Sequence, residues 1–163
     1  MKHLTMAVFV CFFIMTGNTV WAQEDKATAE DVYDLVLKAH TVLSNLGEEG
    51  LEAFNDPNGE FVYKDTYVFV QQCPKYVVAH PFALDKLKGR DLSGVYPHQK
   101  TICEGAKNPN GTWIEYQWPK PGETKPSRKV GFVIPVEGTP YAVVASIYSD
   151  DLSVEELNAQ RNK

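Results

Sequence analysis

The stretch of sequence that decides the fold is Ala142-Val143-Val144-Ala145-Ser146-Ile147, close to the C-terminal end of the chain. Every residue of this stretch except Ser146 is apolar. A strand formed here therefore has no polar face to turn toward water. Such strands lie in the centre of a sheet and are covered on both faces. The fold therefore needs two covering layers, and the rest of the chain offers one candidate for each.

The first candidate is an amphipathic helix expected over Thr28–Leu46. Thr28 suits the N-cap, with Asp31 three positions later in a capping-box arrangement, and Gly47 suits the left-handed residue that ends a helix. The apolar residues recur at three- and four-residue steps and so share one face; they are Val32, Leu35, Val36, Ala39, Leu43 and Leu46.

The second candidate is the excursion, our name for the polar, glycine- and proline-broken residues 81–111, with a short helix expected at about 98–107. β-Branched and aromatic runs on either side predict strands, and their short links predict antiparallel pairing. The fold class is therefore α+β, with a long N-terminal helix on an antiparallel sheet of five to six strands and a ligand pocket under the excursion. The expected strands are Thr66–Gln72, Tyr76–His80, Thr112–Trp118, Lys129–Val136 and Tyr141–Tyr148.

Composition excludes several classes of function. The 163 residues carry 16 Lys and Arg against 21 Asp and Glu, a net charge of −5. An acidic chain lacks the basic face that nucleic acids require, so no nucleic-acid partner is expected. Metal-binding and nucleophile motifs are absent from the sequence, so we expect no metal, no cofactor and no catalytic residue.

Residues 1–22 have the order of a secretory signal peptide: Lys2, an apolar run, then small residues up to Ala22. The alternative is a membrane anchor, but roughly twelve apolar residues fall short of the ~20 that span a bilayer. Cleavage after Ala22 predicts a periplasmic or secreted protein. The expected organisation is a signal peptide at 1–22, one domain at 23–150 and a polar tail at 151–163, for which a frayed helix is one interpretation.

Several segments, in order along residues 30–150, resemble the Cache family of extracytoplasmic sensor domains, in particular its single-Cache type. They are Ala53-Phe54-Asn55-Asp56-Pro57-Asn58-Gly59-Glu60-Phe61-Val62, Tyr67-Val68-Phe69-Val70, Val78-Ala79-His80-Pro81, Lys88-Gly89-Arg90-Asp91-Leu92, Gly111-Thr112-Trp113-Ile114-Glu115-Tyr116-Gln117-Trp118-Pro119, Lys129 and Ser146-Ile147-Tyr148. The resemblance implies a PAS-like sheet and the binding of small organic molecules, often carboxylates or amino-acid-like ligands, without catalysis. It also implies a membrane signalling partner, because family members usually work with one.

The resemblance, together with residue chemistry, nominates six ligand-binding residues: Tyr67, Phe69, His80, Tyr116, Trp118 and Lys129. Lys129, at the head of a strand and at the edge of the pocket, would pair with an anionic group, and His80 would hydrogen-bond the ligand. The aromatic residues would form walls. The alternatives are a solvated lysine, a structural histidine and, above all for Phe69, plain core packing.

Cys73 and Cys103 are the cysteines outside the signal segment. In an oxidising compartment, two cysteines thirty residues apart predict a disulfide that pins the excursion to the hairpin of strands Thr66–Gln72 and Tyr76–His80. The alternative is two separate thiols.

These features predict an exported sensor domain that binds an organic acid or an amino-acid-like ligand and acts with a separate signalling partner. The alternative is a non-catalytic interaction module with a vestigial pocket. In that case the helix over Thr28–Leu46 would form a homodimer.

Overall fold

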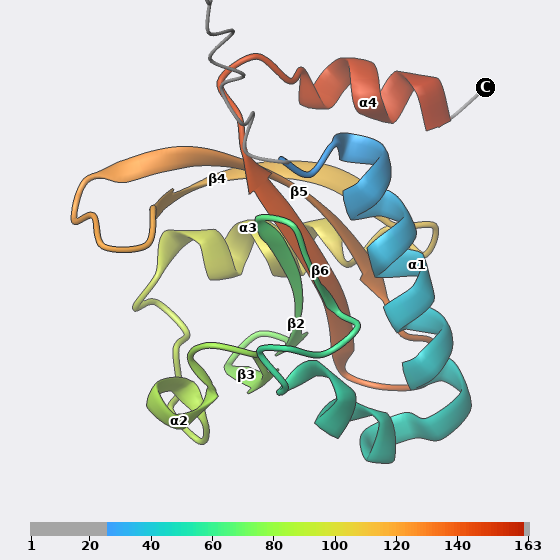
Figure 1. Ribbon diagram of the computed structural model, residues 1–163. Coiled ribbons are helices and arrows are strands. Elements are labelled where there is room, and N and C mark those ends of the chain that lie inside the picture. Colours follow the sequence, from blue (N-terminus) through green and yellow to red (C-terminus); the bar gives the residue numbers. More distant parts are fainter. Residues whose placement is uncertain (1–25, 162–163) are drawn as a thin grey trace, which may run out of the picture.

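The computed structural model describes residues 26–161, so the predicted signal peptide lies outside the described residues. Figure 1 shows an antiparallel sheet with helices on both sides. The helices are α1 (Ala29–Leu46), the 3-10 helix η1 (Gly47–Phe54), α2 (Leu84–Leu87), α3 (Pro97–Gly105) and α4 (Val154–Arg161). The strands are β1 (Val62–Tyr63), β2 (Thr66–Gln72), β3 (Tyr76–Ala79), β4 (Thr112–Pro119), β5 (Pro126–Pro135) and β6 (Tyr141–Tyr148).

Strand β6 is central, as its apolar sequence predicts. The strand order is β1-β2-β6-β5-β4, with β3 paired to β2, and every pairing is antiparallel. All residues of β6 from Tyr141 to Ile147 are buried. Val143 and Ala145 belong to the core cluster on the α1 side, whereas Ala142 and Val144 belong to the cluster on the other side. The α+β class and the sheet are thus confirmed.

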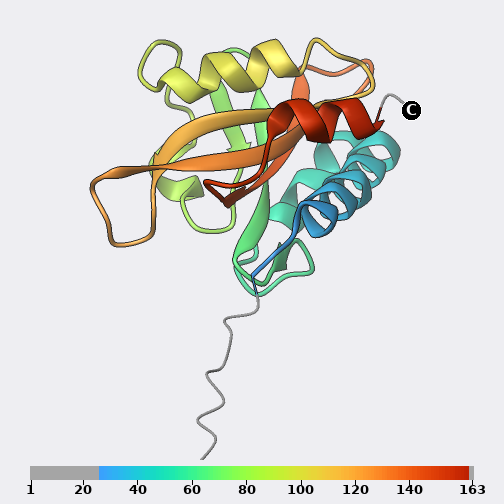
Figure 2. The same cartoon turned by 90° about the horizontal axis from the view of Figure 1, so that it is seen from above.

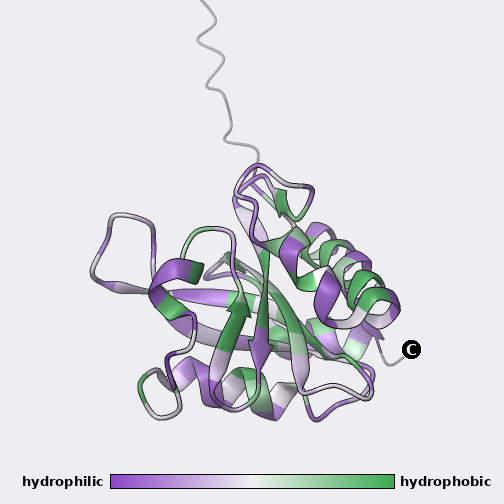
Figure 3. Ribbon diagram, turned by 90° about the horizontal axis from the view of Figure 1, so that it is seen from below, coloured by the Kyte–Doolittle hydropathy of each residue, from purple (hydrophilic) through white to green (hydrophobic). Residues whose placement is uncertain are grey.

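Helix α1 covers one face of the sheet through its apolar stripe. Val32, Val36 and Ala39 are fully buried, and Figure 3 shows green apolar and purple polar residues alternating along the helix. The predicted capping box is present: the Asp31 backbone N–H donates to Thr28 Oγ1 at 3.1 Å, and the Thr28 N–H donates to Asp31 Oδ2 at 2.8 Å.

Helix α3, from the excursion, lies on the opposite face of the sheet from α1 (Figure 2). It approaches the strands closely at Gly105, where a Cβ would lie 2.7 Å from Val133 Cγ1. The predicted disulfide is confirmed, because Cys73 at the end of the β2 strand is bonded to Cys103 of α3. This bond anchors α3 to the hairpin of β2 and β3.

The sequence prediction was incomplete at four places. It missed β1 and α2, two and four residues long, because periodicity needs longer segments. It ended the second strand of the β2–β3 hairpin at His80, whereas β3 ends at Ala79. It began β5 at Lys129, whereas pairing with β4 already starts at Pro126. In the polar tail, where a frayed helix was one interpretation, residues Val154–Arg161 fold as α4.

Helix α4 is held against the sheet by polar side chains that pair with the backbone. Asn158 Oδ1 accepts from the Trp113 N–H at 2.9 Å, and Arg161 Nη1 donates to the Gly111 carbonyl at 2.8 Å. The Arg161 guanidinium also lies 4.6 Å from the centre of the Phe132 ring. Within residues 26–161 no helix combines the length and the apolar character that crossing a membrane requires.

Candidate functional site

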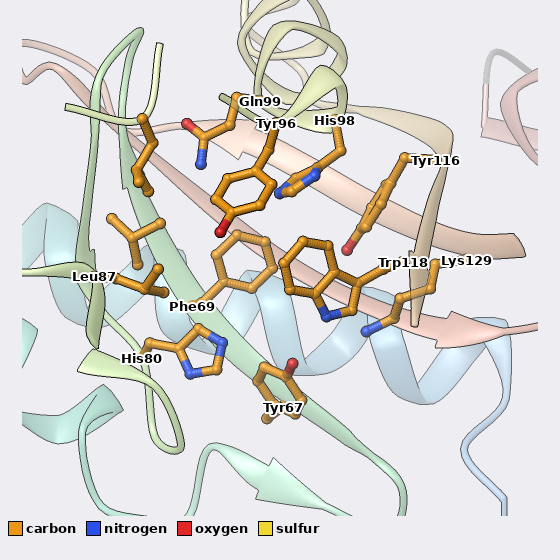
Figure 4. Close-up of a pocket in the computed structure, with 12 residues that line it drawn as sticks. Tyr67, Phe69, His80, Leu87, Tyr96, His98, Gln99, Tyr116, Trp118 and Lys129 are labelled. Atoms are coloured by element: carbon orange, nitrogen blue, oxygen red, sulfur yellow. The ribbon is translucent and has the colours of Figure 1, made fainter. Parts of the chain in front are cut away.

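A cavity of about 50 Å³ lies between the sheet and the excursion, on the α3 side (Figure 4). The structure brings all six predicted ligand-binding residues together around it, from strands β2, β4 and β5 and from the end of β3. Its lining residues are Tyr67, Phe69, Val77, His80, Leu87, Leu92, Tyr96, His98, Gln99, Tyr116, Trp118 and Lys129. Contact with a ligand remains a prediction for each of them.

Lys129 lies inside the wall of the cavity, not at its edge as predicted. It pairs with Tyr116 on β4 and Tyr148 on β6, and only 3% of the residue is exposed. Its ammonium stands 5.2 Å from the centre of the Tyr67 ring and 4.7 Å from that of Tyr148. Among the described residues, no hydrogen bond or ion pair to this ammonium is found. The position is buried because β5 continues on both sides of it in a central part of the sheet.

Burial lowers the pKa of Lys129 from 10.5 to about 8, and the negative charge of Asp65 offsets part of that effect. The amine is therefore mostly protonated at pH 7 although it is surrounded by aromatic rings. Cation–π contacts compensate a buried ammonium only in part. The site thus holds a positive charge that forms no ion pair with any residue among 26–161.

Tyr116 is fixed by a hydrogen bond of 2.7 Å between its hydroxyl and Ser146 Oγ on β6. Gly131, on the strand between them, leaves room for this serine, because a Cβ at that position would lie 2.7 Å from Ser146 Cβ. Burial raises the pKa of the Tyr116 and Tyr67 hydroxyls, so both stay neutral at pH 7. Both hydroxyls therefore contribute polar but uncharged groups to the cavity.

His80 has its ring held by the backbone of the excursion. Its Nδ1 accepts from the N–H groups of Phe82 and Ala83, each at 3.1 Å. Because Nδ1 is an acceptor, the ring proton of the neutral form lies on Nε2. Burial, and then the charge of Lys129, lower the pKa of His80 to about 4. Backbone N–H groups therefore hold one ring nitrogen of His80, and the other nitrogen is left to donate.

The sequence prediction missed the polar residues that α3 brings to the cavity. His98 stacks on Tyr116 with ring centres 5.4 Å apart and lies 4.8 Å from the Trp118 ring, and burial lowers its pKa to about 4. Gln99 follows it in the first turn. One signal was available: Pro97 suits the first position of a helix, which places the next two residues in its first turn.

The arrangement of these side chains suits the binding of a small molecule. The walls are aromatic, two histidines are neutral, and one lysine supplies the charge. Among residues 26–161, no group of three His, Cys, Asp or Glu side chains is arranged to hold a metal ion.

A sheet backed by a helix on one face, with a small pocket under an excursion on the other, defines the class of PAS-like ligand-binding domains. A family model described as "Cache domain" matches residues 25–153, and the chain belongs to this family of sensor domains.

Solved structures share the fold. A structure titled "Structural basis for carboxylic acid recognition by a Cache chemosensory domain" is similar over 74% of this chain and 92% of that one, with 19% identity and a TM-score of 0.57. A periplasmic sensor domain of a chemotaxis protein is 25% identical over 74% and 90% of the two chains, with a TM-score of 0.54. A methyl-accepting chemotaxis protein from Vibrio parahaemolyticus is 15% identical over 76% and 90%, with a TM-score of 0.60.

Proposed function

We propose that this protein is an exported sensor domain whose cavity binds a small organic acid and reports its occupancy to a separate membrane signalling protein. The observation that carries the proposal is the buried ammonium of Lys129, which forms no ion pair among the described residues. Keeping an unpaired charge in a protein interior costs free energy, and a bound anion removes that cost.

The lining residues favour an acid over an amino acid. An α-ammonium group needs carboxylate or carbonyl acceptors, and none of the twelve lining residues is acidic. A carboxylate, in contrast, finds the Lys129 ammonium together with neutral donors from Tyr67 and His80. Two of the similar structures concern carboxylic acid recognition and periplasmic sensing, which supports the same proposal.

A ligand bound at Lys129 would also affect neighbouring elements of the fold. Lys129 is paired with the central strand β6, and His98 belongs to α3, which the disulfide anchors to β2. An anion that contacts both draws the excursion toward the sheet. We propose that a partner senses this change.

A thermal-shift screen of the straight-chain acids from acetate to hexanoate, with amino acids beside them, tests the proposal. Acids should raise the melting temperature of the wild type and not that of Lys129→Met. Lys100→Met is the matched control, since Lys100 is an exposed lysine of α3. If no acid shifts the wild type and a dimer forms with rising concentration, the proposal is wrong and an interaction module is favoured.

A further inference from the structure

The cavity has a second polar group, far from Lys129, which the proposed carboxylate does not use. Gln99 is 3% exposed and lies in the first turn of α3. Its Oε1 accepts a hydrogen bond of 2.6 Å from Nε2 of Gln71, which is fully buried on β2. Figure 4 shows the amide nitrogen of Gln99 on the side of the group that faces the cavity.

The Gln71–Gln99 pair fixes which atom of Gln99 faces the cavity. Gln71 Oε1 is buried without a hydrogen-bond partner, so the pair is not arranged for greatest stability. Turning both amides around would instead bury the Gln71 NH₂ group without an acceptor, and unpaired buried N–H groups are rarer than unpaired carbonyls. Gln71 is therefore a positioning residue that presents the Gln99 NH₂ group as a donor.

The donor of Gln99 has no hydrogen-bond acceptor among residues 26–161. Gln99 is 3% exposed as a residue, but its amide nitrogen is not among the fully buried unpaired atoms, so this nitrogen has access to the cavity. The cavity supplies the space for an acceptor, because Gln99 is among its lining residues. A ligand oxygen is the partner that would complete this amide.

The register of the sheet separates the two polar groups. Gln71 pairs with Ala142 and Lys129 pairs with Tyr148, so the two positions are six residue steps apart along β6, about 20 Å of strand at roughly 3.3 Å per residue. In Figure 4 the side chains of Lys129 and Gln99 reach toward the cavity from opposite sides. A ligand that reaches both needs several carbon atoms between its polar ends.

The other residues that line the cavity indicate whether the ligand group facing Gln99 is charged or neutral. Val77, Leu87 and Leu92 also line the cavity, and with both histidines neutral Lys129 is the one charged group among its lining residues. A second carboxylate at the amide end would be buried without a countercharge. A neutral acceptor, such as a carbonyl, avoids that cost.

We infer that Gln99 determines specificity, and that the ligand is a monocarboxylate carrying a neutral acceptor oxygen several carbons from its carboxylate. This inference rests on the proposed function of Lys129 and names the chemistry at the other end of the same cavity. Unsubstituted fatty acids and dicarboxylates of the same length are then weaker ligands.

Calorimetric titration of the purified protein with pentanoate, 4-oxopentanoate and glutarate tests this inference. The wild type should bind 4-oxopentanoate about 3- to 10-fold more tightly than pentanoate, the worth of one neutral hydrogen bond. In Gln99→Met the preference should vanish while pentanoate affinity is kept. Gln117→Met, at an exposed glutamine of β4, should behave as the wild type.

Three results would overturn the inference while the proposed function survives: equal wild-type affinity for pentanoate and 4-oxopentanoate, an unchanged preference in Gln99→Met, or tightest binding of glutarate. The wild-type comparison decides the question by itself if Gln99→Met does not fold. If none of the three acids binds the wild type, the proposed function and this inference both fail.

Discussion

Replacing Lys129 by Met should make the empty protein more stable and at the same time abolish its response to organic acids. Methionine has nearly the volume of lysine but carries no charge, so the variant removes the buried ammonium without opening a cavity. A lowering of the pKa from 10.5 to about 8 corresponds to about 3 kcal/mol, at about 1.4 kcal/mol per pH unit. We therefore expect the free energy of unfolding at pH 7 to rise by about 3 kcal/mol.

The sign of the pH dependence follows from the same shift. Because the folded pKa of Lys129 is lower than the unfolded value, the unfolded chain binds more protons between about pH 8 and 10.5, and stability rises with pH in that window. The full penalty is present below pH 8. From pH 7 to 9.5 the wild type should gain about 2 kcal/mol relative to Lys129→Met.

Urea denaturation at half-unit steps between pH 7 and 9.5 measures both quantities. The histidines are neutral throughout this range, and Lys100→Met reports the effect of losing an exposed lysine. Equal stability and equal pH slopes for the wild type and Lys129→Met would refute the reasoning, because the ammonium would then be compensated inside the empty protein.

Three further outcomes are expected. The pKa of about 4 for His80 and His98 lies below their usual 6.5, so stability should fall as pH falls from 6.5 to 4, and less steeply in the double variant His80→Gln/His98→Gln; equal acid slopes by urea denaturation would contradict this. Replacing Cys73 and Cys103 by Ser should lower the free energy of unfolding by about 3–4 kcal/mol, since the bond closes a loop over a separation of 30 residues, and urea midpoints that match the wild type would be evidence against it. Gly105→Ala should cost about 1–3 kcal/mol, because the new Cβ would lie 2.7 Å from a valine of β5, and an unchanged melting temperature would show that α3 moves freely.

Much of the fold could be predicted because its decisive signals are local. The apolar run of β6 predicted a central strand, and the Thr28–Asp31 box predicted the start of α1. Both depend on neighbours in sequence. Strand β1 was missed because its two residues are too few to show a periodic pattern, although they pair with β2 across a two-residue turn.

The sequence predicted the cavity-lining residues that lie on strands but not those that lie on helix α3. Alternation along β4 places Tyr116 and Trp118 on one face, whatever lies above them. His98 and Gln99 reach the same cavity only because the disulfide and Gly105 set the position of α3 over the sheet. That placement depends on long-range packing, which a single sequence does not display.

Whether Lys129 binds the anionic group of a ligand is tested most directly by titrating the wild type with matched pairs of charged and neutral ligands. Calorimetry with each acid from acetate to pentanoate beside its amide changes the charge and little else. We expect at least one acid to bind about tenfold or more tightly than its amide, as an ion pair in a buried site requires, and to lose that advantage in Lys129→Met. Equal affinity for acid and amide, or an advantage that Lys129→Met retains, would contradict the central claim that this cavity is built around a bound anion.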